Sequence, residues 1–178
     1  MLKRDNAILV FIDVQGKLSE MVDGSEALLG NLQRLLQGMN ALEVPVMVTE
    51  QIPEKLGPTR EMFQEFITSP AIAKSSFSCC GEPAFFNALE ETGRKQVILC
   101  GIETHICVYQ TALELIASGH KVYVVTDAVS SRNPANRELA LRRMEKVGIR
   151  LTGTEMVLFE LLGNAKDPAF KSILQVVK

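Results

Sequence analysis

The sequence predicts an α/β protein in which helices cover both faces of a mostly parallel sheet. Short runs rich in β-branched residues recur along the chain, and segments with helical spacing of apolar residues separate them. The strand-like runs are almost continuously apolar, which is typical of strands covered on both faces. Together these patterns indicate successive βαβ units.

Five segments have the composition of strands. In chain order they are Ala7–Ile12, Pro45–Thr49, Gln96–Gly101, Lys121–Thr126 and, with the weakest pattern, Ile149–Leu151. The second is followed by Gln51–Arg60, where two prolines and a glycine predict a loop over the sheet edge.

Helical periodicity is clearest over three segments, Gly24–Leu42, Thr104–Ala117 and Asn133–Val147. Glycines just after the second and third of these mark their ends, and Asn133-Pro134 is typical of a helix start. Four shorter helices are expected at Thr59–Ile67, Glu82–Thr92, Glu155–Leu162 and Pro168–Val177.

Composition narrows the class of protein. The 178 residues are 47% hydrophobic and 22% charged, which predicts one globular domain over residues 1–178. A net charge of −2 without blocks of one sign disfavours nucleic-acid and membrane-surface partners. No apolar run approaches the roughly 20 residues of a membrane-spanning helix, and the N-terminus lacks a secretory signal, so a cytoplasmic protein is expected.

Metal and nucleotide cofactors are not expected. The four cysteines form no CxxC pair and there are only two histidines, which leaves too few well-spaced ligands for a structural zinc site. Neither of the glycine-rich phosphate-binding motifs occurs.

Ligands of an open parallel sheet bind beyond the carboxyl ends of its strands, so residues that follow the strands are candidates for chemistry. Asp13 ends the first strand in apolar surroundings, where an unpaired charge would be costly. Cys107 falls in the first turn of a helix, where backbone N–H groups stabilise a thiolate. Lys74 follows a short apolar triplet, Ala71–Ala73, and an ammonium placed near both other residues would lower the pKa of the thiol and hold the carboxylate. Taken singly, each has a plainer interpretation as a turn, core or surface residue.

The remaining histidines and cysteines have weaker patterns. His105 is two residues from Cys107, and such residues do not face each other on a helix, so it is expected as a polar residue of the first turn. His120 is expected at the surface after a helix end. Cys79 and Cys80 are expected in a loop, and Cys100 at the buried end of a strand.

Four segments carry a family resemblance: ILVFIDVQ, AKSSF, GIETHICVYQTALEL and VVTDAVSSR. From about Asn6 to Phe159 the chain resembles the isochorismatase-like cysteine hydrolases, and within them the isochorismatase-domain-containing subgroup. The resemblance implies a three-layer, Rossmann-like fold with about six strands in the order 3-2-1-4-5-6, and a homo-oligomer.

The resemblance also implies roles at the site. Asp13 would take the proton of Cys107, the thiolate would attack a carbonyl carbon, and Lys74 would hold both partners in their charged forms. A cis peptide between Ile102 and Glu103 would direct the backbone N–H groups of Glu103 and Cys107 toward the oxyanion. By position alone, the expected substrate-binding residues are Gln15, Gln51, Phe77 and Thr104.

Departures from the family pattern narrow the substrate. The stretch Thr49–Pro53 lacks the histidine ligands of the metal-dependent nicotinamidases, and a cysteine at position 107 disfavours isochorismate cleavage. What remains is hydrolysis of a small amide or related acyl compound through a thioester. Two alternatives stay open: a catalytically silent binding or scaffold protein, and a redox-responsive thiol protein based on Cys79 and Cys80.

Overall fold

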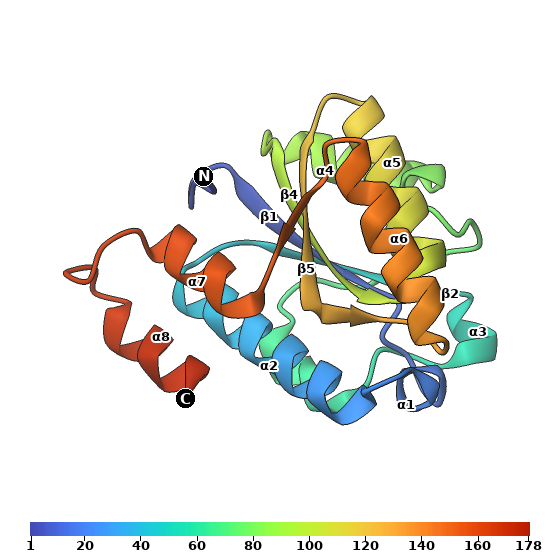
Figure 1. Ribbon diagram of the computed structural model, residues 1–178, viewed down its shortest axis with the longest axis horizontal. Coiled ribbons are helices and arrows are strands. Elements are labelled where there is room, and N and C mark those ends of the chain that lie inside the picture. The colour runs from blue at the N-terminus through green and yellow to red at the C-terminus, as the bar shows by residue number, and fades with distance from the viewer.

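The structure, a computed structural model, describes residues 1–178 and is built around a parallel sheet of six strands in the order β3-β2-β1-β4-β5-β6 (Figure 1). This confirms the predicted fold class and strand order. The strands are β1 Ala7–Ile12, β2 Val46–Gln51, β3 Ile72–Lys74, β4 Gln96–Ile102, β5 Lys121–Ser130 and β6 Arg150–Thr152.

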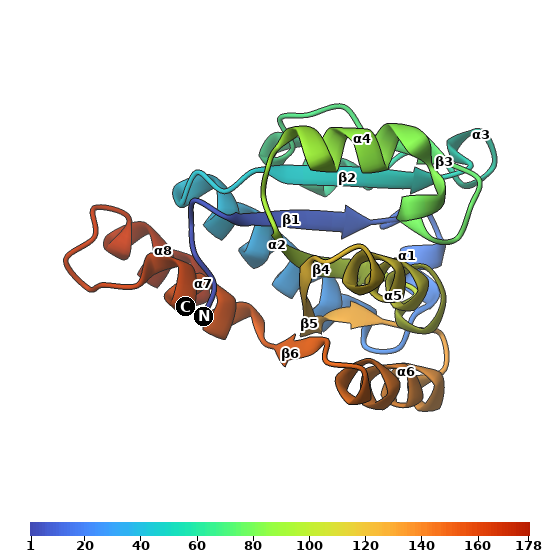
Figure 2. The ribbon, with the colours of Figure 1, turned by 90° about the horizontal axis from the view of Figure 1, so that it is seen from above.

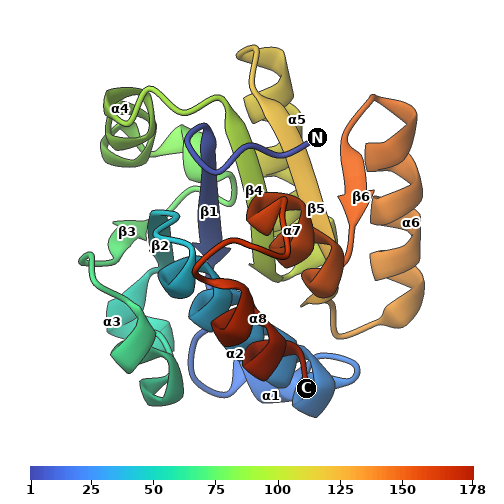
Figure 3. The ribbon, with the colours of Figure 1, turned by 90° about the vertical axis from the view of Figure 1, so that its left-hand side faces the viewer.

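Helices cover both faces of the sheet (Figure 3). The helices packed in the core on one face are α2 Ser25–Ala41, α7 Thr154–Leu162 and α8 Phe170–Val177, and those on the other are α4 Pro83–Glu91, α5 Tyr109–Ala117 and α6 Pro134–Lys146. Every residue of β1 is buried, and its side chains alternate between the two cores. No helix is both long and apolar enough to cross a membrane.

All strands run in the same direction, so their carboxyl ends meet at one edge, where the short helices α1 Leu18–Met21 and α3 Pro53–Leu56 also lie (Figure 2). Near this edge β1 and β4 approach closely at Gly101, which has a φ of +112°. A Cβ atom there would overlap the carbonyl oxygen of Ile12, so only glycine fits.

The strand predictions differ from the structure mainly at the ends. Strand β5 continues to Ser130 rather than stopping at Thr126, because the polar residue that suggested an end, Asp127, has a partner within the fold. Its carboxylate accepts hydrogen bonds from the backbone N–H and hydroxyl of Thr154, the first residue of α7. Strand β3 has three residues, too few to show an alternating pattern.

Some helical segments also differ from expectation. The helix expected over 104–117 begins with a π-helical turn, η3 Thr104–Val108, before α5. The helix expected over 59–67 is a 3₁₀-helix, η1 Glu61–Phe66, and a 3₁₀ turn, η2 Cys79–Gly81, contains Cys79 and Cys80. The loop expected over 51–60 contains α3.

The expectation of a surface position for His120 is wrong. The residue is 3% exposed, because it turns inward after α5. Its Nδ1 lies 3.0 Å from Ser118 Oγ and its Nε2 lies 3.1 Å from Glu90 Oε1.

Candidate active site

A cavity of about 360 Å³ opens at the carboxyl edge of the sheet. It is formed where β1, β2 and β4 end, together with η3 and the loops beside them. Its lining residues are Asp13, Leu18, Gln51, Leu56, Phe77, Ile102, Glu103, Ile106, Cys107 and Arg132. Two residues of the predicted Asp13, Lys74 and Cys107 set therefore line one cavity, and Lys74 contacts it through Asp13 and Gln51.

Asp13 is the first residue after β1, and its backbone turns there into the left-handed region with a φ of +53°. Aspartate adopts this conformation more readily than most residues. The side chain is 2% exposed; its Oδ1 accepts a hydrogen bond of 2.8 Å from Thr49 Oγ1, and its Oδ2 accepts one of 2.7 Å from Lys74 Nζ. The carboxylate is thus held at the cavity by two neighbouring strands.

Lys74 ends the edge strand β3 and extends its ammonium group beneath the cavity. Besides Asp13, the ammonium donates to Gln51 Oε1 at 2.7 Å and to the carbonyl oxygens of Ser76 and Phe77 at 3.2 and 3.1 Å. The side chain has no exposed surface. A buried cation is tolerated here because acceptors surround it.

Cys107 lies within the π-helical turn η3 and is 7% exposed. Burial raises the pKa of its thiol above the ordinary value, and the charge of Asp13 and a hydrogen bond with Asp13 raise it further. Lys74 lowers it, as the sequence predicts, but burial and Asp13 outweigh that effect. The resting sulfur is therefore a thiol beside a carboxylate that can accept its proton.

Glu103 connects the end of β4 to the loop after β5. The peptide bond between Ile102 and Glu103 is cis. The Glu103 carboxylate accepts hydrogen bonds from the backbone N–H of Arg132 at 2.8 Å and from its guanidinium Nε at 3.0 Å. Burial acts to raise the pKa of Glu103, but the hydrogen bonds from Arg132 lower it below its ordinary value.

The four predicted substrate-binding residues separate into two pairs. Gln51 and Phe77 line the cavity, whereas Gln15 and Thr104 do not. Gln15 instead braces the segment after β2: its side chain donates to the carbonyls of Gln51 and Gly57 and accepts from the Gln51 N–H. Thr104 has no exposed surface, and its hydroxyl has no hydrogen-bond partner.

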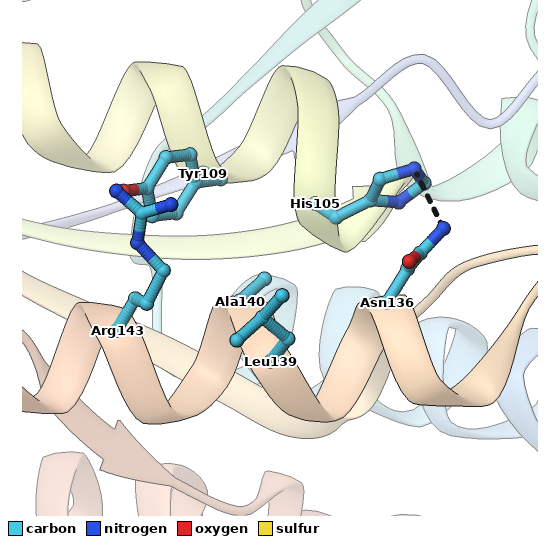
Figure 4. Close-up of a pocket in the computed structure, with 6 residues that line it drawn as sticks. All are labelled: His105, Tyr109, Asn136, Leu139, Ala140 and Arg143. Atoms are coloured by element: carbon cyan, nitrogen blue, oxygen red, sulfur yellow. Dashed lines mark hydrogen bonds between the residues drawn. The ribbon is translucent and has the colours of Figure 1, made fainter.

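His105 faces helix α6 (Figure 4). It does not line the cavity of Cys107. It belongs to a separate hollow of about 140 Å³ between η3, α5 and α6. Its Nδ1 lies 2.9 Å from Ser131 Oγ, and its Nε2 lies 3.5 Å from the Asn136 side-chain nitrogen. His105 is two residues from Cys107 along the helical turn, so the two side chains point to different neighbours, and the ring of His105 points to α6.

Sequence reasoning missed several residues of the cavity: Leu18, Leu56, Ile106 and Arg132. Arg132 follows the true end of β5, so placing that end at Thr126 hid it. The two leucines belong to four-residue helices that are too short to show periodicity. No group of three or more histidine, cysteine, aspartate or glutamate side chains is arranged to hold a metal ion.

The parallel sheet in this strand order, with helices on both faces and a cavity at the carboxyl ends of the strands, defines a three-layer α/β fold. The isochorismatase domain model matches residues 7–156, and the chain belongs to this family, whose members are generally hydrolases.

Curated relatives are isochorismatase domain-containing proteins. Protein 1 of Salmo salar is 40% identical over 146 residues, a match that covers 82% of this chain and 52% of that protein. Protein 2 of Xenopus laevis is 36% identical over 173 residues, covering 97% of this chain and 83% of that protein. The chain thus spans about half the length of the first relative and most of the second.

Solved structures agree in fold. The MAR1 ribonuclease of Caenorhabditis elegans superposes with a TM-score of 0.93 at 34% identity, over 99% of this chain and 91% of that one. YcaC of Escherichia coli, described as an octameric hydrolase of unknown specificity, has a TM-score of 0.93 at 26% identity, over 98% and 88%. YcaC of Pseudomonas aeruginosa, solved with hexane-2,5-diol and covalent acrylamide, has a TM-score of 0.93 at 27% identity, over 98% and 90%.

Proposed function

We propose that the protein is a cysteine-dependent hydrolase of small amides or related acyl compounds, with Asp13, Lys74 and Cys107 as its catalytic residues. The convergence of these side chains at one cavity carries the proposal: Asp13 and Cys107 line it, and Lys74 Nζ lies 2.7 Å from Asp13 Oδ2. An acid that pairs with a cation and lies beside a thiol supplies the components of an activated nucleophile.

In the first half of the reaction, Asp13 takes the thiol proton while the sulfur of Cys107 attacks the carbonyl carbon of the amide. The carbonyl oxygen becomes an oxyanion, which the backbone N–H groups of Glu103 and Cys107 stabilise. The C–N bond then breaks, the nitrogen receives the proton from Asp13, and ammonia or an amine leaves behind a thioester.

In the second half, Asp13 removes a proton from a water molecule that attacks the thioester carbonyl. The C–S bond breaks, the sulfur regains a proton from Asp13, and the carboxylic acid leaves. Throughout the cycle Lys74 holds Asp13 in position and offsets its negative charge.

The raised pKa of Cys107 supports an attack coupled to proton transfer. A sulfur that keeps its proton until a carbonyl carbon is present is protected from other electrophiles, and Asp13 is close enough to remove the proton at that moment. The Pseudomonas aeruginosa relative offers parallel support, because acrylamide is both a small primary amide and an electrophile that reacts with thiols.

Gln51 and Phe77 are proposed to contact the substrate directly, because both line the cavity. We also propose a homo-oligomer in the cytoplasm, without nucleic-acid or membrane partners. The octameric Escherichia coli relative supports the first point, and four free cysteines suit a reducing compartment.

The test is amide turnover by purified wild-type, Cys107→Ala and Asp13→Asn proteins, measured as ammonia release over a panel of small primary amides. Turnover should be lost in Cys107→Ala, and the intact mass of wild type should show an acyl adduct on Cys107 after rapid quenching. Equal turnover by Cys107→Ala would disprove the proposal.

A second candidate function is the binding or scaffold protein without catalysis. Absence of turnover over the whole panel by a folded wild-type protein would favour it. RNA belongs in the same panel, because the Caenorhabditis elegans relative is called a ribonuclease. Cleavage of RNA that persists in Cys107→Ala would point to a different activity and a different site.

A further inference from the structure

We infer that the cavity selects uncharged amides with a compact apolar acyl group, an inference that rests on the proposed function and names its substrate class. It follows from how the charged groups of the site are paired, from which polar atoms are already engaged, and from the side chains that remain to contact a ligand.

The charged groups at the cavity pair off completely. Asp13 pairs with Lys74 at 2.7 Å, and Glu103 pairs with Arg132 at 3.0 Å. Because the thiol of Cys107 is uncharged at rest, the site as a whole is neutral. A charged substrate would leave water without finding an unpaired charge of opposite sign, which is costly in a partly buried cavity.

The polar side chains of the wall are engaged with one another. Both oxygens of Asp13 accept hydrogen bonds, and the Gln51 side chain accepts from Lys74 and donates to the Ser75 carbonyl. Arg132 is the exception: its side chain is 55% exposed, so the N–H groups that do not contact Glu103 are open to water. A polar substituent on the acyl group would therefore find few unengaged partners inside.

The surface that remains is apolar. Leu18, Leu56, Phe77, Ile102 and Ile106 line the cavity, and two of them are large apolar side chains left open to solvent, Phe77 at 56% and Leu56 at 40% exposure. An apolar acyl group would cover both, which gives these exposed side chains a binding role. Along the chain, Leu56 precedes β3 as the last residue of α3, and Phe77 follows β3 in the loop before η2.

The size of the cavity limits the substrate. A volume of about 360 Å³ is near the lower end of the range for small-molecule sites. It suits a branched or aromatic acyl group of about four to seven carbons rather than a long chain.

Two pairs of amides of matched shape test the inference. Isobutyramide and alaninamide differ by a methyl group against an ammonium group, and 4-methylpentanamide and succinamate differ by an isopropyl group against a carboxylate. We expect kcat/KM from ammonia release to be at least about tenfold higher for the uncharged member of each pair. A preference for succinamate would overturn the inference and assign Arg132 as an anion-binding residue.

Protection of Cys107 from iodoacetamide, followed by peptide mass spectrometry, separates failure of this inference from failure of the proposed function. Uncharged amides should protect Cys107 at concentrations at least about tenfold lower than their charged partners, whether or not they are hydrolysed. Selective protection without ammonia release would reject the proposed function and keep the selectivity. Hydrolysis of both members of each pair at equal kcat/KM would reject the selectivity alone.

Variants of the two exposed apolar residues complete the test. Phe77→Ala and Leu56→Ala should each lower kcat/KM for 4-methylpentanamide about tenfold more than kcat/KM for acetamide, whose acyl group is too short to cover them. Met156→Ala, in an exposed apolar residue of α7 outside the cavity, is the matched control and should change neither. Equal losses for both substrates in Phe77→Ala and Leu56→Ala would contradict a role in acyl selection.

Discussion

Lys74 Nζ and Asp13 Oδ2 lie 2.7 Å apart although their residues are 61 positions apart in the chain, and neither side chain has more than 2% of its surface exposed. A buried ion pair of this kind is costly to break on one side only, because the remaining charge keeps its desolvation penalty without its partner.

Replacing one member of this pair should destabilise the fold. Lys74→Met is expected to lower the free energy of unfolding by about 3–5 kcal/mol, since the Asp13 carboxylate loses its buried partner. Urea unfolding measures the change. The double variant Asp13→Asn/Lys74→Met should recover part of the loss, and strictly additive effects would show that the two side chains are not coupled.

The thiol of Cys107 should respond in opposite directions to the two substitutions. Asp13 raises the pKa of Cys107 and Lys74 lowers it, so Asp13→Asn should lower this pKa and Lys74→Met should raise it. In wild type, where burial raises the pKa, the rate of iodoacetamide alkylation should still increase as the pH approaches about 9 instead of reaching a plateau.

Peptide mass spectrometry resolves that alkylation at each of the four cysteines. Cys100, fully buried in β4, serves as the internal reference and should stay unreactive in the folded protein. A wild-type midpoint well below the ordinary thiol value of about 8.5 would mean that Cys107 is a preformed thiolate, contrary to the proton-coupled attack.

Gly101→Ala should reduce stability through contact between strands. The added methyl group would overlap the Ile12 carbonyl oxygen, at a position whose φ is already unfavourable for alanine. We expect the free energy of unfolding to fall by more than about 1 kcal/mol. Gly93→Ala is the matched control, because Gly93 also has a positive φ, +66°, but nothing lies within 4 Å of the added atom. If both variants lost the same free energy of unfolding, the positive φ alone would explain the loss, and contact with Ile12 would contribute nothing.

His120 should make the fold sensitive to acid. Burial lowers the pKa of this histidine, with a smaller contribution from the charge of Lys95, so the unfolded chain binds the proton more readily than the folded one. The free energy of unfolding therefore has its full value above the pKa of histidine in the unfolded chain, about 6.5. It falls as the pH decreases from there toward the pKa of the folded state.

The measurement is the free energy of unfolding in urea at two pH values, one above and one below the unfolded pKa of about 6.5. His120→Gln should reduce the difference between the two free energies of unfolding. A pH dependence that persists in His120→Gln would assign the acid sensitivity to other groups.

The sequence predicts the framework well where periodicity is strong. All six positions of β1 agree with the predicted Ala7–Ile12 strand, because a strand buried on both faces is an unbroken apolar run. Asp13 could be found for the same reason, since a carboxylate beside such a run needs a partner. Lys74 is indicated by the short apolar triplet before it and by the family resemblance of the segment AKSSF, although β3 itself is too short to predict.

Other features depend on contacts that no local pattern encodes. Gln15 has the position of a wall residue, yet its amide binds backbone groups of Gln51 and Gly57, about 40 residues away. The net direction of the Cys107 pKa depends on how much burial outweighs Lys74, which only the assembled site determines. Arg132 remained hidden because Asp127 resembles a strand end while it accepts hydrogen bonds from α7.

Strand β3 is the edge of the sheet and is only three residues long, with Lys74 aligned beside Gln51 of β2. Side chains alternate along a strand, so a slip of one residue would turn Lys74 to the opposite face and leave the buried Asp13 carboxylate without its cation. The ion pair thus selects one register for the least constrained strand. The Lys74–Asp13 ion pair and the completed edge of the sheet therefore depend on the same strand alignment, and a chain misaligned at this edge would lose both.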